Sequence, residues 1–211
     1  MENRDTKQAI LDEALELFAS RGYDGVTVAD IAAAVGIKAA SLYKHFDSKK
    51  DIFDSILQKA SEGYIAMTAQ LGLDGVIYDN DIERYVKMGV ESMVQTGEAF
   101  FHYFLHDKTA RSIRRMLTIE QYKDEQASQL FTAQYIDGAL DYQTGLFTNF
   151  LQLGFMTDID PDIAAIYFYA PLYLMICLCD NCPEREPEAL DIIKRHMIYF
   201  RQLYMKEDKN E

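Results

Sequence analysis

The side chains best suited to binding chemistry lie between residues 36 and 50 of this 211-residue chain. That stretch holds four lysines against a single acid, Asp47, which gives it a local net charge of +3. Ammonium groups bind phosphate, and a lysine such as Lys44 can also bond guanine in the major groove of DNA. The stretch therefore predicts contacts to nucleic acid.

The surrounding residues predict two short helices around a glycine turn. Thr27 stands three positions before an acid, as in a capping box at a helix start. Apolar residues then recur at helical spacing as far as Gly36, where a left-handed residue lets the chain turn. A second short helix is expected at about 39–46, with Leu42 and Phe46 facing inward. This order is typical of a helix-turn-helix, whose second helix enters the major groove.

The run from Thr27 to Phe53, TVADIAAAVGIKAASLYKHFDSKKDIF, resembles the DNA-binding segment of the tetracycline-repressor (TetR) family of bacterial transcriptional regulators. The resemblance extends over about the first sixty residues, with these matches at fixed offsets: Ala14, Leu17, Phe18, Gly22, Tyr23, Thr27, Ile31, Ala32, Gly36, Leu42, Tyr43, His45, Phe46 and Lys49. One departure is Lys38, where the family often has a Ser or Thr that caps the reading helix. The cap must then come from water, from Ser41 or not at all.

The resemblance implies an all-α fold in which an N-terminal three-helix head precedes a larger helical domain. The helix-turn-helix DNA-binding domain is expected at residues 1–50, and an effector-binding and dimerisation domain at 51–211. Such a protein would be a ligand-responsive, sequence-specific regulator, expected to act as a repressor, binding a pseudo-palindromic operator as a homodimer. Phosphate contacts are expected from Thr27, Tyr43, His45 and Lys49, and contacts to base edges or adjacent backbone from Lys38, Ala39, Ala40, Ser41 and Lys44.

The net charge of −13 is the main objection to DNA binding, because it should repel phosphate. Its distribution answers much of the objection. Residues 1–60 carry eight Lys and Arg against ten Asp and Glu, whereas residues 61–211 carry thirteen against twenty-four. The acid therefore lies mostly outside the predicted head. Few phosphates are neutralised per subunit, which favours a dimer and a modest dependence of binding on salt.

The rest of the chain is predicted to be helical. A fourth helix should begin near Lys49 and end near Leu71, and the other helices are expected at about 80–96, 98–106, 109–120, 123–154, 160–180 and 186–206. Gly138, Gly145 and Gly154 leave two alternatives for the helix at 123–154, which are one continuous helix or two pieces.

Ile163 to Cys179 is a run of seventeen residues without a charge. A membrane span is not expected, because Pro171 lies in its middle and acids flank it with no positive cluster. A helix that is apolar on every side is otherwise buried in a core or at a subunit interface. The resemblance implies that the last two helices form a four-helix dimer interface. No signal peptide is apparent, so a cytoplasmic protein is expected.

The middle of the chain is rich in aromatic residues with polar groups between them, which has two interpretations. One is a helical core filled with rings, and the other is an apolar pocket for a small effector, which the resemblance favours. The candidate effector-binding residues are Phe101, His102, Phe104, Tyr122, Tyr135, Phe147, Phe150 and Tyr169. The sequence does not identify the effector, and no other cofactor is expected.

Three cysteines, Cys177, Cys179 and Cys182, leave an alternative function open. They could bind a soft metal or sense oxidation, but structural thiols are commoner in a reducing cytoplasm. The alternative protein is a helical small-molecule, soft-metal or redox-sensing binding protein that uses this cluster or the aromatic pocket. His102 and His106 share a helix face and could hold a metal, but a polar contact lining the core is the preferred interpretation. No catalytic motif is present, so the protein is not expected to be an enzyme.

Overall fold

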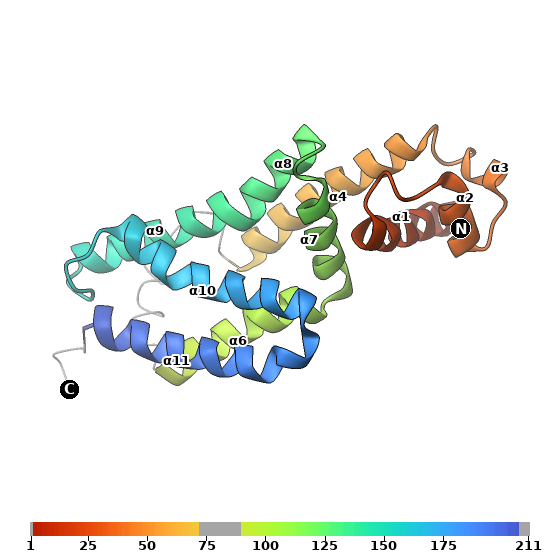
Figure 1. The fold of residues 1–211 in the computed structure, drawn as a ribbon. Coiled ribbons are helices and arrows are strands. Elements are labelled where there is room, and N and C mark those ends of the chain that lie inside the picture. The colour runs from red at the N-terminus through yellow and green to blue at the C-terminus, as the bar shows by residue number, and fades with distance from the viewer. Residues whose placement is uncertain (1, 72–89, 207–211) are drawn as a thin grey trace. The chain divides into compact units, whose positions relative to one another are not determined.

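The computed structural model describes residues 2–71 and 90–206, and its ribbon is shown in Figure 1. The chain divides into two compact units. The first contains Met1–Met67 and Lys108–Gln134, and the second contains Thr68–Asp107 and Tyr135–Glu211. The described residues are helical, and they contain no strand beyond one isolated bridge between Met156 and Met205. The all-α fold predicted from the sequence is therefore confirmed.

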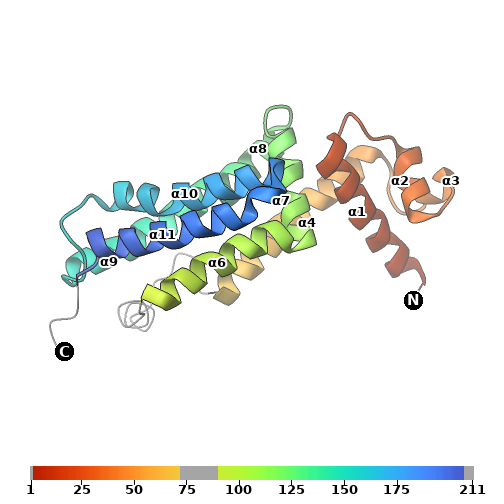
Figure 2. The same cartoon turned by 60° about the horizontal axis from the view of Figure 1, so that its bottom comes forward.

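The first unit combines the N-terminal helices with two helices from the middle of the chain. Its elements are α1 (Glu2–Arg21), α2 (Val28–Val35), α3 (Ala39–Leu42), α4 (Lys49–Leu71), α7 (Lys108–Glu120) and α8 (Glu125–Thr132). The helices α1, α2 and α3 gather around the first turns of α4 (Figure 2). We refer to α1–α3 and these first turns of α4 as the head.

Apolar side chains from all four of these helices form the core of the head. The buried set is Ile10, Ala14, Phe18, Ile31, Ala32, Leu42, Phe46, Ile52, Phe53 and Ile56. The rings of Phe18 and Phe53 meet edge to face, with their centroids 5.6 Å apart. Burying each large side chain contributes about 1.5–3 kcal/mol to the stability of the fold, so these buried residues hold α3 in one orientation within the head. Leu42 and Phe46 are inward, as the spacing predicted.

The turn between α2 and α3 depends on Gly36. Thr27 caps the start of α2 through a capping box with Asp30, as predicted. At the other end, Gly36 has φ +79°, and the Ile37 N–H donates to the Ala32 carbonyl oxygen at 2.9 Å. This is a Schellman-type ending, in which a residue with a Cβ would be strained.

Gly36→Ala should therefore lower the free energy of unfolding by about 1–2 kcal/mol. The cost comes from the positive φ alone, because a Cβ at this position would meet no atom within 4 Å. Gly63→Ala is a matched control, since Gly63 lies inside α4 and a Cβ there would also meet no atom within 4 Å. This substitution should raise the free energy of unfolding by about 0.5–1 kcal/mol. Chemical denaturation of both variants measures the difference. A change of the same sign in the free energy of unfolding of both variants would contradict the role of the positive φ at Gly36.

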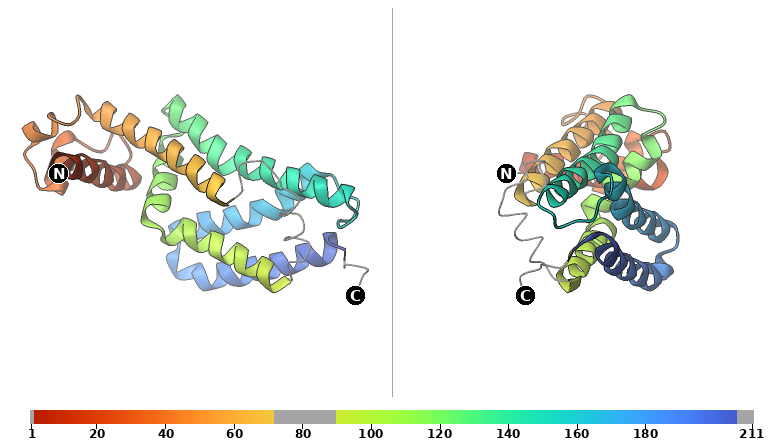
Figure 3. Two further views of the ribbon diagram at one scale, coloured as in Figure 1. Left: turned by 180° about the vertical axis from the view of Figure 1, so that it is seen from behind. Right: turned by 90° about the vertical axis from the view of Figure 1, so that its left-hand side faces the viewer.

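The second unit consists of helices with a shared aromatic core. Its elements are α6 (Val90–His106), α9 (Gly138–Gln152), α10 (Pro161–Asn181), the 3₁₀ turn η2 (Pro183–Arg185) and α11 (Glu186–Tyr204). Helices α6 and α11 pack side by side, as do α9 and α10 (Figure 3). The buried cluster at its centre contains Tyr142, Leu146, Phe147, Phe150, Met156, Ala164, Ala165 and Phe200.

The bounds of several predicted helices need correction. The break expected near Gly97 is absent, because α6 passes through it. A Cβ there would come within 2.8 Å of the Met197 Cε atom, so the glycine permits close packing of α6 on α11 rather than ending a helix. The part of the prediction at residues 80–89 lies outside the described residues. The helix predicted at 123–154 is interrupted by a π-helical turn, η1 (Ala133–Asp137), directly before Gly138.

Helix α10 is the apolar helix predicted from the uncharged run. Asp160 caps its start by accepting the N–H groups of Asp162 and Ile163, and Pro161 occupies the first turn. It is long and apolar enough to cross a membrane by length and composition alone, but one such helix is weak evidence for a span. Part of its apolar surface is exposed.

Candidate nucleic-acid interface

The short helix α3 presents small and cationic side chains to solvent. Five of the predicted DNA contacts, in or beside this helix, are exposed, namely Lys38, Ala39, Ala40, Tyr43 and Lys44. Ser41 is half-buried. The α-helix ends at Leu42, and the chain continues in turns to His45. The observed helix is therefore shorter than the one predicted at about 39–46. The side chains of Ala39 and Ala40 are short enough to let the backbone approach a base pair closely.

The start of α3 has no side-chain cap. Lys38 occupies the N-cap position with extended backbone, and it forms no side-chain bond to the helix. Its carbonyl oxygen accepts the Ser41 N–H at 2.8 Å, which begins the helix. Among the described residues, the first N–H groups of α3 therefore have no protein side chain to bond.

The two lysines of this helix differ from the two that follow it. Within the part of the chain that the structure describes, the ammonium groups of Lys38 and Lys44 form no hydrogen bond or ion pair. Lys50, in contrast, contacts Asp54 at 2.7 Å and Asp124 at 3.1 Å. These carboxylates raise the pKa of Lys50 despite its partial burial. Lys38 and Lys44 are thus the cations of residues 36–50 that remain available for an external anion.

Lys49 has an internal role that the sequence did not predict. Its Nζ atom lies 2.8 Å from the carbonyl oxygens of Tyr23 and Val26, and 4.0 Å from the centroid of the Tyr23 ring. It therefore closes the loop between α1 and α2. Two of the three ammonium hydrogens bond the backbone, which leaves one for the phosphate contact that stays a prediction.

Lys49→Met should accordingly lower the free energy of unfolding by about 2 kcal/mol, since two charge-assisted hydrogen bonds and a cation–π contact are lost. Lys50→Met is the matched control, because it removes a neighbouring charge that bonds no backbone carbonyl. Lys50 forms half-exposed ion pairs with Asp54 and Asp124 and a longer cation–π contact, 5.1 Å from the Phe53 centroid, so its loss should cost about 1 kcal/mol. Thermal and chemical unfolding measure both. A Lys49 variant with unchanged stability and weakened DNA binding would restore the phosphate role.

Thr27 and His45 are also less available to bind phosphate than the sequence suggested. The Thr27 hydroxyl donates to the Asp30 carboxylate at 2.6 Å and accepts the Asp30 N–H at 3.1 Å. This hydrogen bonding lowers the pKa of Asp30. His45 is half-buried beside the core of the head. Both remain predicted phosphate contacts, but Thr27 would have to exchange its present partner.

Helix α7 contacts the head directly, at the exit from α1. The buried Glu120 carboxylate accepts the N–H of Tyr23 at 2.8 Å, and its Oε1 atom would lie 2.9 Å from a Cβ placed on Gly22. The hydroxyl of Ser112 donates to Glu16 at 2.5 Å. The sequence carried no signal for these contacts, since about a hundred residues separate the partners. They link α1 to α7 within the first unit.

Comparison with known proteins agrees with this geometry. Residues 10–56, which contain the core of the head and all of α2 and α3, match the family described as bacterial regulatory proteins, tetR family. The biofilm operon icaADBC HTH-type negative transcriptional regulator IcaR of Staphylococcus aureus is 37% identical over 107 residues, which cover 44% of this chain and 56% of that protein. The corresponding regulator of Staphylococcus epidermidis is 36% identical over 97 residues, covering 40% and 52%.

The N-terminal segment of this chain, residues 10–56, matches the TetR family. It spans about half the length of the curated relatives it matches. Solved structures share the fold: SmeT, the repressor of the Stenotrophomonas maltophilia multidrug efflux pump SmeDEF, has a TM-score of 0.63 at 19% identity, covering 98% of this chain and 94% of SmeT. A transcriptional regulator from Saccharomonospora viridis in complex with choline has a TM-score of 0.64 at 20% identity, covering 96% and 99%.

The predicted effector-binding residues do not form one group. Five are buried in the second unit, namely Phe101, Phe104, Tyr135, Phe147 and Phe150. Tyr169 is half-buried, and its hydroxyl donates to the Tyr135 carbonyl oxygen at 2.8 Å. Tyr122 lies exposed in a turn of the first unit, and His102 is exposed on α6.

The buried rings largely contact each other. Phe147 stacks on Phe200 with centroids 5.4 Å apart, and Phe168 meets both rings edge to face. The interpretation as a helical core therefore describes Phe147 and Phe150 better than a pocket does. A separate groove of about 630 Å³ is formed in the first unit by α4 and α8, and it is lined by Asp51, Asp54, Ser55, Leu57, Gln58, Ser61, Glu62, Gln126, Gln129, Leu130 and Ala133. None of the predicted effector residues contributes to this groove.

The cysteines give little support to the alternative metal-binding or redox-sensing function. All three are free thiols, and Cys179 is buried. Burial, followed by the nearby Glu186 carboxylate, raises the pKa of Cys179, which lowers its reactive thiolate fraction. Among the described residues, the group of His, Cys, Asp and Glu that gathers closely enough to hold a metal does not include these thiols.

Proposed function

We propose that this chain is a sequence-specific, DNA-binding transcriptional regulator that represses its target as a homodimer and responds to a small effector. The observation that carries the proposal is the exposed surface of α3, where the Lys38 and Lys44 ammonium groups stand beside two alanines and bond no other described residue. This surface combines phosphate-binding charge with close access to base edges. The relative IcaR is named a negative transcriptional regulator, which favours repression. Such a role would place the protein in the cytoplasm.

A homodimer follows from the size of the reading helix. The four residues of α3 can contact only a few base pairs, so one head gives little specificity. Two heads related by a two-fold axis would read a pseudo-palindrome, with half-sites about one helical turn apart. In our proposal, residues 1–50 bind DNA, and residues 51–211 bind the effector and form the dimer.

The dimer would use the exposed apolar face of α10 together with α11. The exposed large apolar residues on these two helices are Ile163, Ile166, Tyr167, Leu174, Tyr199 and Leu203. Those on α10 recur at helical spacing and form one stripe. The rings of Tyr167 and Tyr204 lie 6.4 Å apart, which places that stripe next to α11. An apolar patch of this kind on a soluble protein is typical of an interaction surface.

The chain connectivity supports a route by which an effector would act. α6, in the second unit, ends at His106, and α7 begins two residues later in the first unit. α7 bonds the head through Glu120 and Tyr23. An effector that favours one arrangement of the second unit would therefore bias the position of α7 and lower the population of DNA-competent heads. SmeT is known in a complex with triclosan and the Saccharomonospora viridis regulator with choline, so effectors of this size suit the fold.

Selection from a random duplex DNA library with the purified full-length chain, at low and near-physiological salt, tests the proposal. We expect recovery of a pseudo-palindromic site with two half-sites about ten base pairs apart. Sites without two-fold symmetry would contradict dimeric reading. If no site is recovered at either salt while small molecules bind, the chain is a ligand-binding protein that does not read DNA.

A further inference from the structure

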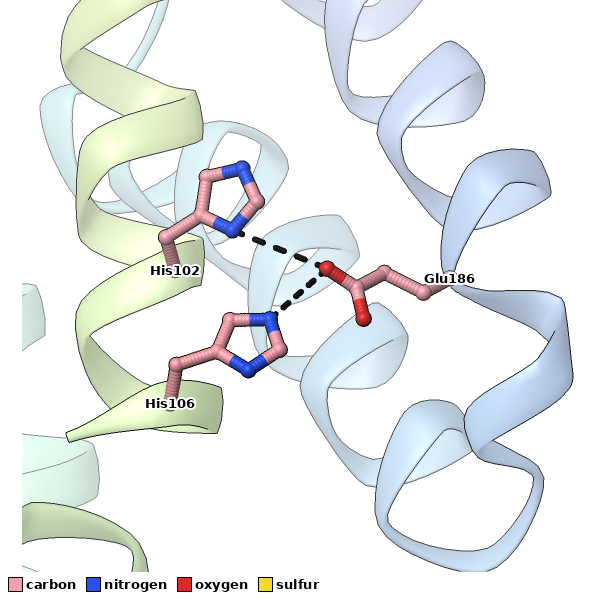
Figure 4. A group of neighbouring side chains, drawn as sticks. All are labelled: His102, His106 and Glu186. Carbon is pink, nitrogen blue, oxygen red and sulfur yellow. Dashed lines mark hydrogen bonds and ion pairs between the residues drawn. The ribbon is translucent and has the colours of Figure 1, made fainter. Parts of the chain in front are cut away.

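Two histidines of α6 and one glutamate of α11 converge on the surface of the second unit (Figure 4). The Nδ1 atom of His102 lies 3.6 Å from Glu186 Oε1, and the Nε2 atom of His106 lies 2.8 Å from the same oxygen. One ligand atom from each residue falls within 4.8 Å of the other two. We propose that His102, His106 and Glu186 form a binding site for a divalent transition-metal ion of the Zn²⁺ class.

The spacing of the three atoms suits a tetrahedral metal. With ligand bonds of about 2.0–2.2 Å, neighbouring ligands in a tetrahedral Zn²⁺ site lie about 3.4 Å apart. The contact from His102 to Glu186 already has this length, and the contact from His106 would open by about half an ångström. The two rings are 5.4 Å apart and inclined by only 30°, so both can turn an edge toward one point. Small side-chain rotations are therefore sufficient.

The donor set also fits the ion. Imidazole nitrogen with a carboxylate oxygen favours zinc, copper and nickel over calcium or magnesium, which prefer oxygen ligands alone. Two histidines at i and i+4 lie on one face of a helix, which is how helical metal sites present imidazole pairs. Three protein ligands leave the fourth position for water or an exogenous ligand, so the site is of the open type.

The site is open to solvent, so an ion can enter it, and the Glu186 carboxylate would offset part of the ion's charge. The side chains of His102, His106 and Glu186 are 47%, 55% and 25% exposed. The adjacent guanidinium of Arg185 does not compete for Glu186, because it forms a bidentate pair with Glu188 at 2.6 and 2.8 Å. A bound divalent cation would thus meet the Glu186 carboxylate and one nitrogen from each imidazole.

The ion would connect two elements that are distant in sequence. His106 ends α6, and Glu186 begins α11, so coordination would join the last turn of the first helix to the first turn of the second. The two helices already pack closely where Gly97 faces Met197. A metal at this end would fix their separation along the remaining length. This inference does not depend on DNA binding.

Zinc titration of the chelator-treated, full-length protein against a chromophoric competitor tests the site. We expect one Zn²⁺ per chain. His102→Gln, His106→Gln and Glu186→Gln should each weaken binding at least tenfold, since each removes one of three ligands. Glu184→Gln is the matched control, because it removes an exposed carboxylate two residues from Glu186 and should leave the affinity unchanged. Far-UV circular dichroism confirms that the variants remain helical.

Two further measurements separate this site from the cysteines. Cobalt substituted for zinc should give visible d–d absorption without the strong near-ultraviolet thiolate band, because no sulfur is a ligand. Cys182→Ser should bind zinc as tightly as the unaltered chain. Loss of binding in Cys182→Ser, or zinc affinity that is unchanged in the His102→Gln/His106→Gln double variant, would overturn the proposal.

Discussion

Replacing Lys38 and Lys44 together by alanine should reduce operator affinity on the order of a thousandfold at 0.1 M salt. A homodimer would lose four ammonium groups, and each phosphate contact contributes about 0.9 to the slope of log affinity against log salt concentration. The slope should therefore fall by about 3.6. Fluorescence anisotropy with the selected operator, measured over a series of salt concentrations, gives both quantities.

The control for that experiment is Lys123→Ala/Lys194→Ala, which makes the same change in net charge. Lys123 and Lys194 are exposed and lie outside α3, on a turn of the first unit and on α11. Their loss should change affinity only by general charge effects. If both double variants lose affinity equally, α3 has no special role in binding.

Single variants distinguish a contact to a base edge from a contact to the phosphate backbone. Lys44→Ala should alter base preference in a repeated selection, because lysine can bond guanine directly. Tyr43→Phe should weaken binding equally on every sequence, because a hydroxyl bonded to phosphate carries no sequence information. An equal loss on all sequences for Lys44→Ala would assign that side chain to the backbone.

Local sequence patterns predicted the head well because short-range interactions set its helices. Thr27 caps α2 through a residue three positions away, and Gly36 ends it through its own backbone conformation. The inward positions of Leu42 and Phe46 follow from helical spacing. Each of these features depends on neighbours within one or two helical turns, which is the range that a single sequence reveals.

Interactions between distant residues were not predictable in the same way. The resemblance assigned Lys49 to phosphate. The carbonyl oxygens that bind it belong to residues 23 and 26, and since any residue type could supply them, no sequence pattern reveals this contact. The imidazole pair on α6 was visible as a spacing, but it was expected to line the core. The structure instead exposes both rings and brings Glu186 to them from eighty residues away. Tertiary packing decides these outcomes.

Leu174→Glu/Leu203→Glu should convert the proposed homodimer into a monomer. Leu174 on α10 is 61% exposed and Leu203 on α11 is 62% exposed, so neither carboxylate disturbs the fold of one subunit. In a dimer formed through these helices, four charges would be buried without partners. At about 1 kcal/mol or more for each, their combined cost exceeds 4 kcal/mol, which weakens association at least a thousandfold. Analytical ultracentrifugation measures the change.

Leu153→Glu is the matched control, because Leu153 is a similarly exposed leucine at the end of α9 and lies on neither of the last two helices. This variant should remain a dimer. If the Leu174→Glu/Leu203→Glu variant is also dimeric, the interface lies elsewhere. A monomeric variant should still bind a single half-site through its head, but it should lose the added affinity of the second half-site. Retained full-site affinity in a proven monomer would mean that one α3 helix supplies the specificity, which its four residues make physically implausible.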